Sequence, residues 1–359
     1  MNGIGTGAAL HPGEAGRPLL EARGLTKHFK VGGNLSRQTL HAVDDVDISI
    51  NGNEIVALAG ESGSGKSTVA RLLARVYKPT SGQIYYQGRS LSTIQSRRDM
   101  LAYRGDVPMV FQDPFSALNP TYRVSHAIMR GIKLHRTDLT TKSQRYEEAE
   151  RVIERVGLHP AADVLQRFPH EFSGGERQRI CFAQALAYRP KLILADEPVS
   201  MLDISIRIGL LNVMARMRAE EHVSFLYITH DIASARYIAD RIVIMYAAHV
   251  VEVGPTDEVL FDPKHPYTQL LLSAVPDPRA PLAAQNETDQ GEPPRVIDPK
   301  PGCRFRDRCP LAIEECHRIT PELRHLEGDH TVACHVATST AVPRVDRASS
   351  DLPSLERDE

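Results

Sequence analysis

Residues 60–68 read Gly60-Glu61-Ser62-Gly63-Ser64-Gly65-Lys66-Ser67-Thr68. The stretch matches G-x-x-x-x-G-K-[ST], follows an apolar run at 55–59 and precedes a helical pattern that starts near Thr68. In that setting the glycines allow successive backbone N–H groups to face phosphate oxygens, and the helix N-terminus adds partial positive charge. We expect Lys66 to reach the β- and γ-phosphates of ATP and Ser67 to bind Mg²⁺. The alternative, a Gly-rich turn with a surface lysine, does not explain the strand and helix on either side.

A second motif joins an apolar run to two carboxylates, in the order Leu192-Ile193-Leu194-Ala195-Asp196-Glu197. The carboxyl end of a buried strand is where α/β sheets bind ligands. We expect Asp196 to hold Mg²⁺, directly or through water, and Glu197 to orient and polarise the attacking water. Many strands end in Asp, so this motif gains its meaning from the phosphate loop.

The sequence from residue 18 to about 255 alternates short apolar runs with longer helical patterns, which predicts an α/β fold. Four runs read as buried strands of a sheet covered on both faces: Ile55–Ala59, Val107–Phe111, Leu192–Ala195 and Phe225–Thr229. The region 113–189, including Gln144–Val156, is mainly helical and predicts a helical subdomain inserted into the α/β core. No internal repeat is present.

Composition argues against several classes of protein. The 359 residues carry a formal net charge of -2, which gives no sign of a nucleic-acid partner. No apolar run approaches the roughly 20 residues of a membrane span. Residues 1–17 lack the basic and apolar parts of a signal peptide, so we expect a cytoplasmic protein with a flexible N-terminal tail.

The class of ATPase is indicated by Phe172-Ser173-Gly174-Gly175-Glu176, which resembles the signature sequence of ABC (ATP-binding cassette) transporter ATPases. Ser173 is a favourable helix N-cap, and the glycines permit close approach to an anion. The resemblance covers residues 20 to 335. It implies a P-loop NTPase fold of the ABC type, with the helical subdomain and a small C-terminal Cys-rich extension.

Other positions match the family in their order along the chain. The resemblance implies that Gln112 reaches the metal and the nucleophilic water, that Asp203 belongs to the D-loop and that His230 contacts the γ-phosphate. Phe29 is placed like the aromatic residue that stacks on adenine, although a lone Phe is more often a core residue. Departures such as Met201 for Ala, or Ala247-Ala248 for Ala-Gly, remove no phosphate, metal or water ligand, so we expect an active enzyme.

The family implies partners, because ATP binds between the phosphate loop of one chain and the signature of another. This chain has one of each, so it needs a second ATPase chain, either a copy of itself or a paralogue. The family also implies two membrane-spanning permease subunits, an extracytoplasmic solute-binding protein that acts indirectly, and a peripheral location on the cytoplasmic face of the inner membrane. A cytosolic ABC ATPase without a transport role is the alternative class.

The segment after the ATPase core contains His265-Pro266-Tyr267-Thr268 and resembles the C-terminal extension of dipeptide/oligopeptide permease ATPases. That resemblance implies peptide import. Oligosaccharide and nickel importers have related ATPases and remain alternatives, since the solute is chosen by other subunits. The same four residues can also be interpreted as a proline turn that closes a helix.

Four of the five cysteines lie in one short stretch, at Cys303, Cys309, Cys316 and Cys334. In a reducing compartment this clustering favours a metal site over disulfides. The gaps are wider than the usual zinc pairs, and four thiolates suit an iron–sulfur cluster. The family resemblance also implies [4Fe–4S]. Zinc, with His317 and His335 as substitute ligands, and free thiols remain open. The segment is polar, so the metal is expected to be its main stabilising element, and Arg304, Arg306 and Arg308 to offset the cluster's charge.

The predicted organisation follows from these signals. It comprises a tail at 1–17, a nucleotide-binding domain at 18–255 with its helical subdomain at about 113–189, a C-terminal extension at 256–336 that contains a Pro-rich linker at 278–294, and a disordered tail at 337–359.

Overall fold

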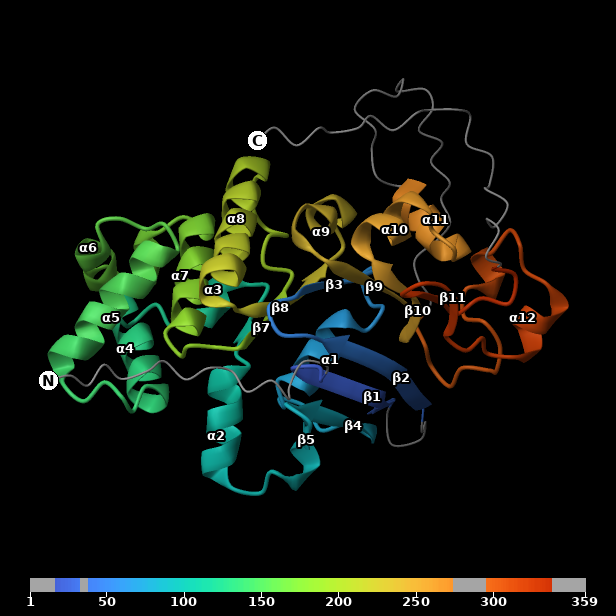
Figure 1. Ribbon diagram of the computed structural model, residues 1–359, viewed down its shortest axis with the longest axis horizontal. Coiled ribbons are helices and arrows are strands. Elements are labelled where there is room, and N and C mark those ends of the chain that lie inside the picture. The colour runs from blue at the N-terminus through green and yellow to red at the C-terminus, as the bar shows by residue number, and fades with distance from the viewer. Residues whose placement is uncertain (1–16, 33–37, 274–294, 338–359) are drawn as a thin grey trace, which may run out of the picture.

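The structure is a computed structural model that describes residues 17–32, 38–273 and 295–337. Helices α4–α8 gather at one end of the molecule, the sheets occupy its middle, and the segment with α12 and β11 lies at the opposite end (Figure 1). The predicted tails and the linker at 278–294 fall, apart from residues 17 and 337, outside the described residues.

The larger sheet has the strand order β11-β12-β10-β9-β3-β8-β7-β6 in the part of the chain that the structure describes. Its central pairs, β9 with β3, β3 with β8, β8 with β7 and β7 with β6, are parallel. The pairs β9–β10, β10–β12 and β12–β11 are antiparallel. The strand bounds are β3 Ile55–Ala59, β6 Met109–Val110, β7 Leu192–Asp196, β8 Ser224–Thr229, β9 Arg241–Tyr246, β10 His249–Pro255, β11 Arg324–Glu327 and β12 His330–Val332.

The parallel strands are buried on both faces, as their apolar sequences predict. Alternate residues of β3 enter different cores: Ile55 belongs to one hydrophobic cluster and Val56 to the other. The same alternation separates Phe225 from Leu226 in β8, because successive strand side chains point to opposite faces. The four predicted strands are therefore confirmed, with one difference. The run Val107–Phe111 forms only the two-residue strand β6.

A smaller antiparallel sheet packs over one of these cores in the order β2-β1-β4-β5. The sequence analysis did not predict this sheet. Helix α1 and Tyr103 of α2 contribute to the same core. The bounds are β1 Leu20–Val31, β2 Gln38–Ile50, α1 Lys66–Leu73, β4 Ser81–Tyr86, β5 Arg89–Ser90 and α2 Arg97–Asp106.

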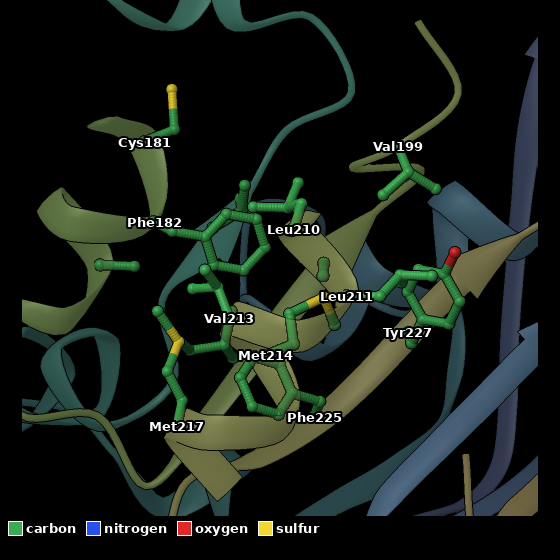
Figure 2. Close-up of a cluster of buried hydrophobic side chains, with 14 of the residues drawn as sticks. Cys181, Phe182, Val199, Leu210, Leu211, Val213, Met214, Met217, Phe225 and Tyr227 are labelled. Carbon is green, nitrogen blue, oxygen red and sulfur yellow. The ribbon is translucent and has the colours of Figure 1, made fainter. Parts of the chain in front are cut away.

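Helices cover the other face of the larger sheet, and those of the region 113–189 form the predicted helical part. Figure 2 shows how this core packs, with Phe182 of α7 beside Leu210 of α8 and Phe225 of β8 beneath Met214. Helix α5 begins at a capping box in which the Thr141 side chain accepts from the Gln144 amide. The bounds are α3 Pro114–Ala117, α4 Val124–His135, α5 Lys142–Arg155, α6 Ala161–Gln166, α7 Gly174–Leu186, α8 Ile204–Glu221 and α9 Ile232–Ile238.

The C-terminal extension contains α10 Thr256–Phe261, α11 Pro266–Ser273 and α12 Glu314–Arg318 as well as β11 and β12. Two expectations about it are wrong. Pro266 starts helix α11 instead of closing a helix, which suits a residue without an N–H group. The second concerns residues 303–334, the Cys-bearing segment, which was expected to bury little apolar surface. Phe305 of this segment is 2% exposed and packs in the main core.

The extension is tied to the rest of the larger sheet by a buried carboxylate. Glu252 of β10 accepts hydrogen bonds from the backbone N–H groups of Lys264 and His265, at 2.6 and 3.0 Å, and pairs with His330 Nε2 at 2.7 Å. Strand β12 adds to β10. The larger sheet therefore runs through the predicted boundary near residue 255, and the domain limits stay a prediction. Among the described residues, no helix has the length and apolar character to cross a bilayer.

Candidate ATP site

Four neighbouring parallel strands end at one edge of the larger sheet, and each delivers a predicted site residue there. The phosphate loop follows β3, Gln112 follows β6, Asp196 ends β7 with Glu197 directly after it, and His230 follows β8. The carboxyl ends of parallel strands share one sheet edge, so residues far apart in the sequence meet.

The phosphate loop requires glycine at two positions for steric reasons. Gly60 and Gly65 have φ values of 147° and 108°. A Cβ atom on Gly60 would lie 2.1 Å from the Met245 carbonyl oxygen, and one on Gly65 would lie 2.3 Å from the Ala42 carbonyl oxygen. Backbone atoms cannot yield to such contacts, so the loop fits against β9 and β2 only without side chains.

Lys66 occupies the centre of this loop and is 4% exposed. Its Nζ donates to the carbonyl oxygens of Gly60 and Glu61, at 2.7 Å each. Burial lowers the pKa of Lys66, whereas the carboxylates of Glu197, Asp196 and Glu61 oppose that shift. The ammonium group is thus held where phosphate oxygens would replace the carbonyl groups as its partners.

The two predicted magnesium ligands from the loop and β7 lie in contact. Ser67 Oγ donates to Asp196 Oδ1 at 2.8 Å. Burial raises the pKa of Asp196, the hydrogen bond from Ser67 counters that effect, and a hard divalent cation would favour the ionised form. A hydroxyl and a carboxylate at this spacing are oxygen donors of the kind Mg²⁺ prefers, so the residues fit the ion.

Glu197 gathers the predicted catalytic residues around one carboxylate oxygen. Its Oε2 accepts from Gln112 Nε2 at 3.0 Å and lies 3.2 Å from His230 Nδ1. Glu197 has a φ of 45°, in the left-handed region, and its backbone N–H donates to the Ile228 carbonyl oxygen at 3.0 Å. Unusual backbone conformations of this kind recur at functional sites, where surrounding contacts hold them.

The signature residues lie elsewhere, at the start of α7. Ser173 caps that helix: its Oγ accepts from the Glu176 amide at 3.4 Å, and Glu176 Oε2 accepts from the Ser173 amide at 2.8 Å. A Cβ on Gly175 would lie 2.4 Å from Ile206 Cγ2. Within the described residues, no hydrogen bond or ion pair joins Ser173–Glu176 to the phosphate loop of the same chain.

Two further predicted nucleotide contacts are separate from that centre. Asp203 is exposed as the N-cap residue of α8. Phe29 is half-buried on β1, with its ring 5.6 Å from that of Tyr77 and Lys27 Nζ 5.0 Å from its centroid. The ring of Phe29 is therefore partly accessible, and its contact with adenine stays a prediction.

A set of contacts that was not predicted from the sequence joins the extension to residues beside the phosphate loop. Arg304 donates to Asp44 and to the Ala247 carbonyl oxygen, and Asp44 also pairs with His28 and His41. Arg308 and Tyr267 both contact Glu61 of the phosphate loop. Charged and hydroxyl side chains show no pattern in the sequence that identifies their partners, so these contacts could not be predicted. Arg304 and Arg308 therefore form ion pairs with Asp44 and Glu61 of the ATPase core. This corrects the expectation that these two arginines offset the charge of a metal cluster.

Burial opposes the ionisation of Asp44, but hydrogen bonds from Arg304, His28 and His41 outweigh it and lower its pKa to about 2. Asp44 is thus a fixed anion beside the site at neutral pH.

The four clustered cysteines come together in the extension, where all are free. Burial raises the pKa of the Cys303 thiol to about 11, and the neighbouring Cys316, Cys334 and Cys309 add to that shift. Backbone N–H groups face three of the sulfur atoms, from Phe305 to Cys303, from Leu311 to Cys309, and from Val336 and Ala337 to Cys334. Amide donors of this kind stabilise thiolates.

A phosphate loop between strand and helix, a hydroxyl–carboxylate pair and a carboxylate flanked by Gln and His define a P-loop nucleoside triphosphatase. Comparison with known proteins agrees. Residues 43–200 match the family described as ABC transporter, and residues 251–316 match the one described as Oligopeptide/dipeptide transporter, C-terminal region.

Relatives cover nearly the whole chain. The oligopeptide transport ATP-binding protein AppF of Bacillus subtilis is 40% identical, over 89% of this chain and 97% of AppF. YkfD of the same organism, provisionally named for the same role, is 41% identical over 89% of this chain and 95% of YkfD. The ATP-binding cassette MJ0796, solved as a dimer in a post-hydrolysis state with ADP and Pi, has a TM-score of 0.59 at 25% identity and covers 66% of this chain and 98% of MJ0796.

The chain belongs to the family of ABC transporter ATP-binding proteins. It is accordingly an ATPase that uses ATP with Mg²⁺, and its partners are of two kinds, a second ATPase domain and membrane permease subunits.

Proposed function

We propose that this chain is the ATP-hydrolysing subunit of an importer that carries dipeptides or oligopeptides across the cytoplasmic membrane. The observation that carries this proposal is the match of residues 251–316 to the oligopeptide/dipeptide transporter C-terminal region. The names of AppF and YkfD support it. The same ATPase in an oligosaccharide or nickel importer is the alternative.

We propose the following roles for the residues of the site. Gly60–Thr68 binds the phosphates, and Ser67, Gln112 and Asp196 surround Mg²⁺. Glu197 orients the attacking water, and Gln112 and His230 hold the Glu197 carboxylate and approach the γ-phosphate. Phe29 contacts adenine. Ser173–Glu176 and Asp203 act on the ATP bound by the second chain, which is consistent with their separation from this chain's own phosphate loop.

The proposed assembly contains a second ATPase chain, a copy or a paralogue, and two permease subunits on the inner face of the membrane. A solute-binding protein outside the membrane acts through those permeases. Nucleic acid has no role in this assembly, and the net charge of -2 supports that view.

We further propose that Cys303, Cys309, Cys316 and Cys334 hold a [4Fe–4S] cluster. The amide groups that face three of the sulfurs suit metal-bound thiolates. Four thiolates are the usual ligand set of such a cluster, whereas zinc sites usually pair their cysteines two to four residues apart.

Anaerobic purification tests the cluster. We expect a brown protein with about four irons per chain, and the Cys316→Ser variant should lose most of that iron. The Cys181→Ser variant is the control, because Cys181 is buried in α7 away from the cluster segment. A colourless protein with one zinc per chain would refute the cluster and leave the ATPase assignment intact. His335, whose Nε2 donates to the Ile319 carbonyl oxygen, would then be examined as a ligand through Nδ1.

Transport is tested by reconstituting the chain with the permease subunits and the solute-binding protein of its transporter. We expect ATP-dependent uptake of labelled dipeptides or oligopeptides into vesicles, abolished by Glu197→Gln. Calorimetry on the solute-binding protein identifies the ligand class. Binding of an oligosaccharide or of nickel, with no peptide binding, would replace the proposed solute.

A further inference from the structure

Arg308 of the C-terminal extension binds the side chain of Glu61, the second residue of the phosphate loop. Arg308 Nη1 donates to Glu61 Oε2 at 3.0 Å, and Arg308 Nη2 donates to Glu61 Oε1 at 3.1 Å. Two parallel N–H···O bonds of this kind fix orientation as well as distance. The Arg308 and Glu61 side chains are only 15% and 23% exposed, so this ion pair is more than a mobile surface contact.

The backbone of Glu61 is held by a second residue of the extension. The Glu61 N–H donates to Tyr267 Oη at 2.9 Å. Tyr267 is fully buried on α11. The H-P-Y-T element therefore contacts the phosphate loop directly. Its proline starts α11, and this helix places the tyrosine in the core beside Glu61.

Aromatic packing holds these two contacts in place. The rings of Tyr246, Tyr267 and Phe305 come from β9, from α11 and from the Cys-bearing segment, with centroid separations of 4.6, 5.2 and 5.5 Å. All three are nearly fully buried. Arg308 lies over this cluster and also donates to Tyr246 Oη at 3.3 Å. Packed rings limit the rotamers of Tyr267 and Arg308, so both reach Glu61 already ordered.

The location of Glu61 gives these contacts a consequence for ATP. Its carbonyl oxygen accepts from Lys66 Nζ, and its carboxylate is close enough to act on the Lys66 ammonium group. An unpaired carboxylate here would stand at the edge of a loop built to bind a polyanion. Arg308 neutralises that charge, and Tyr267 Oη accepts from the Glu61 amide of the loop.

We propose that Arg308 and Tyr267 are positioning residues of the ATP site, so that the C-terminal extension sets the shape and charge of the phosphate loop. The proposal rests on the phosphate-loop assignment. Neither residue touches ATP. Each acts through Glu61, which makes the nucleotide affinity of this ATPase depend on a segment outside its core.

Nucleotide titration of four variants of the full chain tests the proposal, with Mg²⁺ and a fluorescent ATP analogue as probe. Arg308→Gln should weaken binding roughly 3- to 10-fold, because it exposes the loop to the Glu61 charge. Tyr267→Phe keeps the ring and should weaken binding roughly 2- to 10-fold through one lost hydrogen bond. Glu61→Gln in the Arg308→Gln background should restore most of the affinity. Glu61→Gln alone is the reference for this rescue and should bind about as tightly as the double variant.

Matched controls separate positioning from general stability. Arg318→Gln removes an exposed arginine of the same extension, and Tyr237→Phe removes an exposed hydroxyl that bonds to Asn212. Both should bind the analogue like the wild type. Lys66→Ala reports on the loop itself: if it binds normally, the loop assignment fails. If it binds weakly while Arg308→Gln and Tyr267→Phe bind normally, or if Glu61→Gln gives no rescue, the positioning proposal is overturned and the loop stands.

Discussion

Glu197 Oε2 is the atom on which the site converges, since Gln112 and His230 both approach it. Replacing this carboxylate by an amide keeps its shape and removes the base. We expect Glu197→Gln to bind ATP normally and to lower turnover by about 10²- to 10⁴-fold.

Steady-state phosphate release and nucleotide titration measure the two effects of Glu197→Gln separately. Glu220→Gln, an exposed change on α8, is the control and should behave like the wild type. Hydrolysis by Glu197→Gln at the wild-type rate would show that another group orients the water.

Lys66 is a buried cation surrounded by the carbonyl groups of its own loop. Lys66→Ala keeps the loop amides and removes the one side-chain cation that the described part of the loop contains. We expect ATP affinity to fall at least about 10-fold, the order of one hydrogen bond to a charged group. Fluorescent-nucleotide titration measures this, with exposed Lys133→Ala as control. Unchanged affinity would contradict the phosphate-binding role of Lys66 and, with it, the assignment of the phosphate loop.

At the scale of elements, the start of α7 presents the signature away from its own phosphate loop. Ser173→Arg adds bulk and charge there. We expect it to block ATP-driven dimerisation while single-chain ATP binding survives. Size-exclusion chromatography with the partner chain, in the Glu197→Gln background, is the measurement. Ser173→Ala is the matched control, because it removes the helix cap, at a cost of about 1 kcal/mol, without adding bulk. A dimer of normal size from Ser173→Arg would argue against the two-chain site.

The β9–β10 turn contains two alanines in the left-handed region, with φ values of 44° at Ala247 and 72° at Ala248. A side chain costs about 1 kcal/mol or more in that region. Ala248→Gly should therefore raise the free energy of unfolding by up to about 1 kcal/mol, since the backbone entropy of glycine offsets part of the gain.

Chemical denaturation tests the effect of Ala248→Gly. The opposite sign is expected for Ala233→Gly, an exposed position inside helix α9, where glycine costs about 1 kcal/mol. If both glycine variants are destabilised alike, the left-handed conformation of Ala248 is not a source of strain.

At the scale of the whole molecule, two histidines near the contact between the ATPase core and the extension are held without charge, His265 fully buried and His249 half-buried. Burial lowers the pKa of His265 to about 3 and that of His249 to about 4, and for His249 Arg304 and His41 add to the shift while Asp44 opposes it. The unfolded chain protonates these groups near pH 6.5, so it binds more protons than the fold between about pH 4 and 6.5.

Stability should therefore fall as the pH is lowered from 7 to 5, by about 2 kcal/mol for each histidine. Denaturant unfolding at several pH values measures the slope. His249→Asn should reduce the slope, and His170→Asn, at an exposed position, should leave it unchanged. A stability that is flat between pH 5 and 7 would contradict the buried neutral state.

The amino-acid sequence alone determined the parallel core and the main parts of the ATP site. Apolar runs predicted β3, β7 and β8, and the two carboxylates that follow the β7 run selected Glu197. Chain order together with the family resemblance selected Gln112 and His230, and these two residues lie beside Glu197 in the structure. The strands and the phosphate loop can be recognised because their signals are local: the glycines, the Lys and the helix start lie within a few residues of one another.

Only the tertiary structure decided how the extension meets the core. Tyr267 and Arg308 contact Glu61 across 206 and 247 residues of sequence. Phe305 packs in the main core, which its polar neighbours in the sequence gave no reason to expect. A charge or a hydroxyl carries no periodic signal for its partner, because the same arginine can pair with any carboxylate that the fold brings near. The link between the extension and the phosphate loop therefore became visible only when the packing of β10, α11 and the Cys-bearing segment was known.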